Sequence, residues 1–150
     1  MFAPKTILVP TNLSPESENS LRKAVEVACQ YGSTIYLLHV IDSNISRRMV
    51  QNGIWQEDLM EHIRAMRTQA LQEMIERQRE AFLPAREVRI VPILKVGLPS
   101  SEILREQKER DIDLVVLGSH KRQGLFSRLL SKVADRVVKS ASFPALVVAH

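Results

Sequence analysis

The sequence predicts an α/β fold, namely an open, doubly wound sheet of five parallel strands flanked by four helices. Two observations support this class. Short apolar segments alternate along the chain with segments in which apolar residues recur at helical spacing, as in parallel sheets with helical crossovers. The strand segments are also continuously apolar, as in residues 6–10, which is typical of strands buried on both faces. No repeat or linker divides the sequence, so we expect one domain over residues 1–150.

The chain begins with a strand, a helix and a second strand. Residues 6–10 form the first strand. Ser14 then supplies a capping hydroxyl, and Pro15 supplies the first position of a helix that ends at Gly32, because these residue types favour helix starts and stops. Residues 34–41 form the second strand. The three elements predict one strand–helix–strand unit of a parallel sheet.

The middle of the chain predicts a loop followed by the longest helix. Residues 42–53 are polar and predict a loop, whereas residues 56–82 have one apolar face at helical spacing. The methionines at positions 60, 66 and 74 are interpreted as side chains that fill the core. The apolar face consists of Leu59, Ile63, Met66, Ala70, Met74 and Phe82.

The second half of the chain supplies three more strands and two helices. Residues 88–96 form the third strand, and Pro92 within it indicates an edge position or a bulge, because proline cannot donate to the ladder. The other elements are a helix over 99–110, a strand over 113–117, a helix over 127–140 and a strand over 144–149.

Composition narrows the class of protein. No apolar run reaches the roughly 18 residues of a membrane span, and the chain enters a strand too early for a signal peptide. Cys29 is the single cysteine, so no disulfide can form within one chain, and we expect its side chain in the core. The four histidines lack metal-ligand spacing. We therefore expect a cytoplasmic protein, and we predict no metal site.

The net charge of +4 is unevenly distributed. Residues 120–140 contain six basic residues and one acidic residue, whereas the rest of the chain has a net charge of −1. On a helix over 127–140, four of the basic residues share one face. This face is either a solvated surface or a docking surface for nucleic acid or an acidic protein, and the residues leave both interpretations open. The four are Arg128, Lys132, Arg136 and Lys139.

Candidate ligand-binding residues follow the ends of the predicted strands. In an open doubly wound sheet, ligands bind at the carboxyl ends of the strands, and small and polar residues gather in these segments. Gly118 and Gly124 lie between a buried strand and a helix, an arrangement from which α/β proteins build phosphate sites. The segment is neither a P-loop nor a dinucleotide fingerprint, because the required glycine spacing is absent.

These segments, in this order, resemble the universal stress protein family over essentially the whole chain. The opening strand and helix are similar in residues 7–17, the second strand in residues 37–40 and the third crossover in residues 96–103. The fourth strand is similar in residues 113–120, and the closing strand in residues 144–148. The resemblance implies a nucleotide-binding, Rossmann-like sheet and a homodimer formed through the last strand. The implied dimer-interface residues are Ala145, Leu146, Val147 and Val148.

The nucleotide motif of the ATP-binding members is kept only in part. That motif has a glycine, a second glycine after two residues, and a third glycine after nine more, followed by serine or threonine. Gly118 occupies the first position, but Lys121, Ser131 and Lys132 occupy the others, and Asn12 stands where aspartate is common. A Cβ at these positions narrows the approach of backbone to phosphate, whereas the lysines offer side-chain charge. A divergent ATP pocket, a pocket for another anion and an empty pocket therefore stay open.

The resemblance implies a non-catalytic module for stress adaptation or signalling that responds to a nucleotide or another ligand and acts as a dimer. Two alternatives stay open: a slow ATPase or phosphotransferase, and an RNA- or protein-binding adaptor that uses the basic helix. Ser119 and His120 do not predict a hydrolase, because no nucleophile-elbow pattern surrounds Ser119, and we predict no catalytic residue. The implied nucleotide-binding residues are Pro10, Thr11, Asn12, Val40, Val96, Gly97, Leu117, Gly118, His120, Lys121, Arg122, Ser131, Lys132 and Val133.

Overall fold

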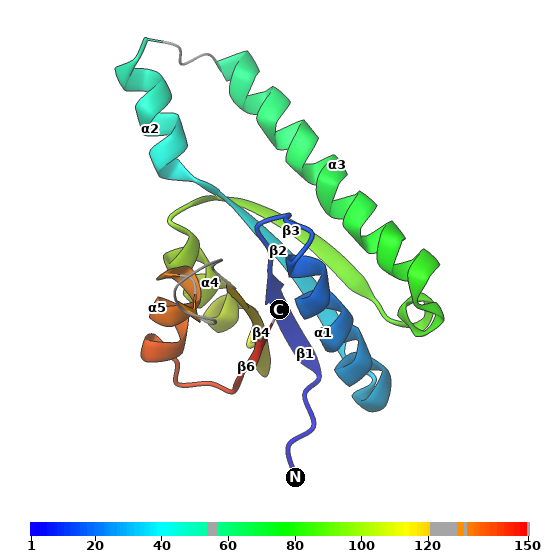
Figure 1. Ribbon diagram of the computed structural model, residues 1–150. Helices are drawn as coiled ribbons and strands as arrows, with labels where there is room; N and C mark the ends of the chain where they lie inside the picture. Colours follow the sequence, from blue (N-terminus) through cyan, green and yellow to red (C-terminus); the bar gives the residue numbers. More distant parts are fainter. Residues whose placement is uncertain (54–56, 121–128, 131, 150) are drawn as a thin grey trace.

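The sheet contains five parallel strands, as the sequence predicts (Figure 1). The strands of the computed structural model are β1 (Thr6–Pro10), β2 (Thr34–Asp42), β3 (Ile90–Gly97), β4 (Leu114–His120), β5 (Leu129–Leu130) and β6 (Ala145–Val148). The parallel strands follow the order β3-β2-β1-β4-β6, and the short β5 pairs antiparallel with the end of β4. The structure describes residues 1–53, 57–120, 129–130 and 132–149.

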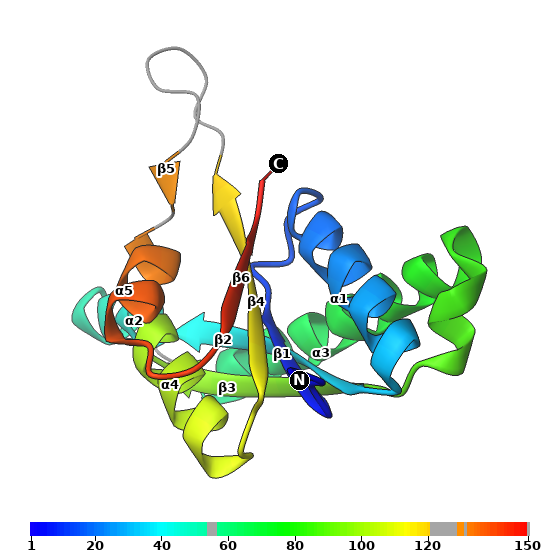
Figure 2. The same ribbon diagram turned by 90° about the horizontal axis from the view of Figure 1, so that it is seen from below.

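Helices cover both faces of this sheet, which confirms the doubly wound arrangement (Figure 2). They are α1 (Ser17–Tyr31), α2 (Ser43–Gln51), α3 (Glu57–Ala81), α4 (Pro99–Glu109), α5 (Lys132–Ser140) and the 3-10 helix η1 (Leu83–Glu87). α1 and α3 pack on one face, and α4 and α5 pack on the other. Within the described ranges, none of these helices has the length and hydropathy needed to cross a membrane.

Alternate residues of the central strand β1 point into two separate cores. Ile7 and Val9 pack with α1 and α3, whereas Leu8 packs with α4 and α5. All three side chains are fully buried, since successive side chains of a strand point to opposite faces. Burial on both faces explains why the strand is continuously apolar in the sequence.

Residues 42–53, predicted as a loop, contain helix α2 instead. Asp42 caps this helix, because its side chain accepts a hydrogen bond from the Asn44 N–H (2.9 Å). Met49 is buried, whereas Ile45 is exposed. The prediction was wrong because it followed the polar average of the segment, although Ile45, Met49 and Val50 recur at helical spacing within it.

α1 begins later than predicted. The N–H groups of residues 17–19 bond to the carbonyls of residues 14–16 in a tight turn, so Pro15 lies before the helix. The Ser14 N–H and hydroxyl both bond to Asn12 Oδ1 (3.0 and 2.5 Å), which is a local turn rather than a helix cap. This turn holds the segment after β1 in place.

The apolar face of α3 is buried along its second half. Leu71 and Met74 are buried, whereas Leu59 and Met66 are 36% and 59% exposed. The first half of α3 extends beyond the sheet (Figure 1), and there Met60 is buried although Leu59 and Met66 are not. The predicted core role is therefore confirmed for Met60 and Met74 and is wrong for Met66.

Two smaller predictions have different outcomes. β3 is an edge strand, as Pro92 predicts.

Cys29 is exposed rather than in the core, and its Sγ lies 3.5 Å from the Pro84 carbonyl oxygen. The buried face of α1 ends one residue earlier, at Ala28, so Cys29 lies just beyond the positions that face the sheet.

Candidate functional site

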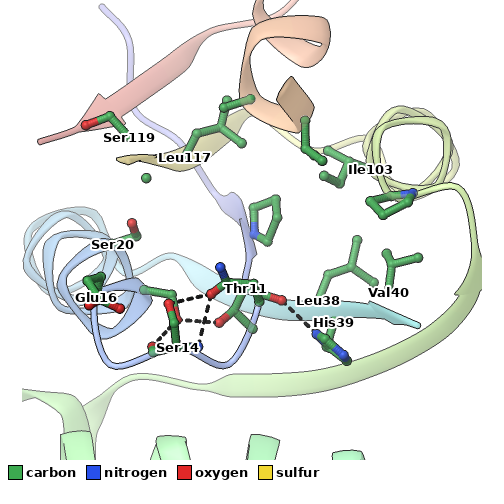
Figure 3. A pocket seen from close by; sticks show the side chains of 17 residues that line it. Thr11, Ser14, Glu16, Ser20, Leu38, His39, Val40, Ile103, Leu117 and Ser119 are labelled. Carbon is green, nitrogen blue, oxygen red and sulfur yellow. Dashed lines mark hydrogen bonds between the residues drawn. The ribbon is translucent and has the colours of Figure 1, made fainter. Parts of the chain in front are cut away.

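A cavity of about 210 Å³ opens where the strand order reverses, between β1 and β4 (Figure 3). The chain passes from β1 outwards to β2 and β3, and then crosses to β4 and β6 on the other side. Such a reversal leaves a crevice at the carboxyl ends of the strands. Residues from the ends of β1, β2 and β4 and from the first turns of α1, α4 and α5 line the cavity. It therefore lies where small ligands bind in doubly wound proteins.

The cavity brings together half of the predicted nucleotide-binding residues. Those that line it are Pro10, Thr11, Asn12, Val40, Leu117, Gly118 and Val133. Those that the structure describes but does not place in the lining are Val96, Gly97 and Lys132. Those that lie outside the described residues, or whose side chains do, are His120, Lys121, Arg122 and Ser131.

Gly97, at the end of β3, lies close to a side chain of α4. A Cβ on Gly97 would lie 2.7 Å from Oε1 and 2.8 Å from Cγ of Glu102, well inside normal van der Waals contact. Glu102 is buried in the first turn of α4, and its carboxylate pairs with Arg105 (3.3 Å). A side chain at position 97 would therefore require the Glu102 side chain to move.

The wall that α1 contributes was missed by the sequence analysis. Ser14, Ser17 and Ser20 line the cavity together with Glu16. The serines recur every three residues, so a helical segment brings them to one side, and this spacing is the signal that could have identified them. The other lining residues that were missed are Leu38, His39, Pro99, Ile103, Ser119 and Ala134.

The cavity has a polar side and an apolar side. Ser20, Glu16 and Ser119 lie on one side, and Val40 and Ile103 lie on the other (Figure 3). Glu16 is the one acidic or basic side chain, apart from a histidine, among the described lining residues. No group of three or more His, Cys, Asp or Glu side chains in the described part of the chain could hold a metal ion. The geometry suits a ligand with a flat apolar ring and polar substituents.

Thr11 fixes the loop between β1 and α1. Its hydroxyl bonds to Ser17 Oγ (2.7 Å) and accepts a hydrogen bond from the Leu13 N–H (3.0 Å). Ser17 Oγ in turn donates to the Ser14 carbonyl (2.6 Å). Leu13 has a φ of 66°, which is uncommon for a residue with a side chain. The hydrogen bonds of Thr11 and Ser17 hold this strained loop beside the cavity.

His39 connects the cavity to α3. Its Nδ1 lies 2.8 Å from the Thr11 carbonyl oxygen, and its Nε2 lies 2.8 Å from Nη1 of Arg67. Nδ1 therefore donates to Thr11 while Nε2 accepts from Arg67, which is the pattern of a neutral imidazole. Burial lowers the pKa of His39 below its ordinary value of 6.5; the Thr11 hydrogen bond opposes this effect, and the positive charge of Arg67 adds to it.

The lowered pKa of His39 makes the protein less stable in mild acid. Below pH 6.5 the unfolded chain binds a proton that the folded chain excludes, so the free energy of unfolding falls as the pH is lowered towards the folded-state pKa. The slope contributed by this one proton reaches at most about 1.4 kcal/mol per pH unit. His39→Gln is expected to remove this contribution to the pH dependence of the free energy of unfolding, as measured by urea denaturation at pH 7, 6 and 5. His62→Gln, at an exposed position of α3, is the matched control, and equal slopes for all three proteins would contradict the assignment.

The structure shows only part of the predicted basic stripe near the cavity. α5 begins at Lys132 and is preceded by strand β5, so the longer predicted helix is wrong, and Arg128 lies outside the described residues. Lys139 pairs with Asp135 (3.0 Å). Lys132 and Arg136 are exposed. The described part of the stripe is therefore three residues on α5, one of which is paired with a carboxylate.

The fold and the cavity define an α/β protein with a small-ligand crevice at the switch point of its sheet. The model of the universal stress protein family matches residues 4–149. The chain belongs to this family, which confirms the resemblance identified from the sequence.

Relatives and solved structures extend over nearly the whole chain. The universal stress protein MJ0577 of Methanocaldococcus jannaschii is 26% identical over 152 residues, which cover 96% of this chain and 94% of the relative. Its solved structure matches with a TM-score of 0.74 and 25% identity, covering 100% of this chain and 98% of that one. Two further structures share the fold: a universal stress protein in complex with cAMP (TM-score 0.69, 18% identity, 98% of each chain) and one from Archaeoglobus fulgidus in complex with dAMP (0.63, 20%, 98% of each).

Proposed function

We propose that this protein binds a small adenine nucleotide in the cavity between β1 and β4 and serves as a non-catalytic, ligand-responsive module in stress adaptation. The position of the cavity at the switch point of the sheet carries the proposal. Proteins of the same fold were solved with cAMP and dAMP. The apolar side, with Val40 and Ile103, suits the adenine ring, and the polar side suits the rest of the nucleotide.

ATP is the less favoured ligand in this proposal. Glu16, an exposed side chain of the described lining, carries a carboxylate that repels a triphosphate more than a monophosphate. At the positions of the family's ATP motif, Lys121, Ser131 and Lys132 replace residues that let the backbone approach phosphate closely. A nucleotide with one phosphate group is therefore expected to bind more tightly than ATP.

Titration calorimetry of the full chain tests this function. AMP and cAMP are expected to bind, and ATP is expected to bind about tenfold more weakly, a difference of about 1.4 kcal/mol. Inorganic phosphate is the control for binding through the phosphate group alone. The absence of binding by all three nucleotides at millimolar concentration would contradict the proposal. Formation of ADP from ATP and Mg²⁺ would contradict its non-catalytic part.

The proposal includes a homodimer formed through β6. Among the described residues, β6 pairs with β4 along one edge, and Leu146 and Val147 are 36% and 39% exposed. An unpaired apolar edge favours pairing with another strand. A second copy of the chain is the occupant that a two-fold axis allows, because the same edge then pairs with itself and the assembly closes.

The direction of the main-chain N–H and C=O groups of β6 supports pairing along its free edge. The Val115 N–H donates to the Pro144 carbonyl (3.1 Å), and main-chain groups alternate in direction along a parallel strand. The main-chain groups of Leu146 therefore face β4, whereas those of Ala145 and Val147 face the free edge. These outward groups are available to a second β6 strand.

The proposal also describes a single domain and a cytoplasmic location. The extent of the family match, over residues 4–149, supports one universal stress protein domain over residues 1–150. The cytoplasmic location is retained from the sequence analysis, where it rests on the composition of the chain.

A further inference from the structure

The hydroxyl of Ser20 on α1 is buried and has no hydrogen-bond partner among the described residues. Ser20 is 1% exposed, and its Oγ makes no hydrogen bond to any residue that the structure describes. A serine in a helix often bonds to the carbonyl of the preceding turn, as Ser17 does with the Ser14 carbonyl (2.6 Å). A buried hydroxyl that stays unpaired destabilises the folded protein, so such a group in a native structure needs an explanation.

This unpaired hydroxyl belongs to the wall of the cavity. Ser20 lines the cavity together with Glu16, which lies four residues earlier on the same side of α1 (Figure 3). Ser119, on the facing strand β4, already donates to the Val148 carbonyl (3.3 Å). The other described hydroxyls of the lining are bonded within the loop after β1. Ser20 is therefore the hydroxyl of the described lining that is left without a partner.

Glu16 narrows the chemistry of the group that Ser20 can bind. An ionised carboxylate accepts hydrogen bonds and repels phosphate, whereas a serine hydroxyl both donates and accepts. A hydroxyl group of the ligand satisfies both side chains, because it can donate to one and accept from the other. With the base on the apolar side, near Val40 and Ile103, the sugar is the part of a nucleotide that reaches the opposite polar side.

We propose that Ser20 binds a ribose hydroxyl of the nucleotide and makes the cavity selective for ribonucleotides over deoxyribonucleotides. This inference rests on the proposed nucleotide-binding function and adds a specificity-determining residue to it. Without ligand the Ser20 hydroxyl has no partner, because folding has already removed it from water. A ribose hydroxyl that bonds to Ser20 therefore adds a hydrogen bond that does not compete with one to water. Selectivity then follows, because a deoxy sugar leaves the buried hydroxyl unpaired.

Calorimetry with wild type and Ser20→Ala tests the contact. The ligands are AMP and its 2′-deoxy and 3′-deoxy analogues. Wild type is expected to bind AMP about tenfold more tightly than at least one deoxy analogue, which corresponds to one hydrogen bond. Ser20→Ala is expected to bind AMP about tenfold more weakly than wild type and to lose that preference, since the two changes remove the same interaction and are not additive.

Urea denaturation without ligand gives a second, independent measurement. Ser20→Ala removes an unpaired hydroxyl and introduces a better helix former, so its denaturation midpoint is expected to equal or exceed that of wild type. Ser33→Ala is the matched control, because Ser33 is also buried but its hydroxyl donates to the Pro4 carbonyl (2.5 Å) away from the cavity. That variant is expected to have a lower midpoint and unchanged nucleotide affinity.

Four results would overturn the role of Ser20. If Ser20→Ala binds AMP with the affinity of wild type, the role of Ser20 is overturned while the proposed function stands. The same conclusion follows if wild type binds AMP and both deoxy analogues equally well. A fall in the Ser20→Ala midpoint like that of Ser33→Ala shows that the hydroxyl is bonded within the protein, and also overturns it. Absence of nucleotide binding by wild type is a separate result, which overturns the proposed function and the role of Ser20 together.

Discussion

The Val40→Phe variant is expected to bind AMP and cAMP at least about 100-fold more weakly than wild type, a loss of about 2.7 kcal/mol. Val40 lies near the carboxyl end of β2 and lines the apolar side of the cavity. A phenyl ring at this position occupies the space proposed for the adenine base. Leu38 and Ile103 beside it are almost completely buried, and close-packed neighbours cannot move aside without further loss of free energy.

A matched variant separates loss of the cavity from loss of the fold. Val91→Phe introduces the same change on the neighbouring strand β3, at a position that is also partly buried but does not line the cavity. Its nucleotide affinity is expected to equal that of wild type. Calorimetry measures the affinity of each variant, and far-ultraviolet circular dichroism verifies that each is folded. A folded Val40→Phe protein with wild-type affinity would show that the nucleotide binds elsewhere.

The Val147→Pro variant is expected to be a folded monomer at concentrations where wild type is a dimer. The Val147 N–H faces the free edge of β6, as the bond from Val115 to the Pro144 carbonyl indicates. Proline removes this N–H and places a ring on the edge, so it blocks a second strand without removing a bond to β4. Because a two-fold axis relates the two copies, the dimer carries the substitution in both β6 strands. The dissociation constant of the dimer is therefore expected to rise at least about tenfold.

Leu146→Pro is the control for this experiment, because the Leu146 N–H faces β4 instead of the free edge. This variant is expected to lose thermal stability, since it damages the sheet of its own chain. Light scattering coupled to gel filtration measures the mass of each variant, and thermal denaturation measures its stability. A Val147→Pro protein that stays dimeric would contradict pairing through β6, as would a monomeric wild type.

The strands of the sheet could be identified from the sequence, because strands that are buried on both faces consist largely of apolar residues. β1, β2 and β4 contain runs of apolar residues that are buried on both faces, and a parallel sheet covered by helices requires this. Pro92 also placed β3 at the edge correctly, since an interior strand needs every N–H. Alternation of these strands with helical segments was then enough to predict the doubly wound topology.

The helices at the periphery could not be predicted so well. α2 and the first half of α3 bury few side chains, as the exposure of Ile45 and Met66 shows. Periodicity in a sequence reports an apolar face, but it does not report whether a partner covers that face. In α3 the pattern continues beyond the point where the sheet ends (Figure 1), so the same periodicity corresponds to buried side chains in the second half and to mostly exposed ones, such as Leu59 and Met66, in the first.

The sequence by itself determined the strand ends of the candidate site, such as residues 10–12 and 117–118, because a parallel sheet brings its carboxyl ends to one edge. Only the tertiary structure decided which helices close the cavity. Ser17 and Ser20 look in the sequence like ordinary polar residues of a helix, and their burial depends on how α1 packs across β1 and β4. The burial of a polar side chain depends on residues far away in the sequence that pack against it, so the local sequence does not reveal it.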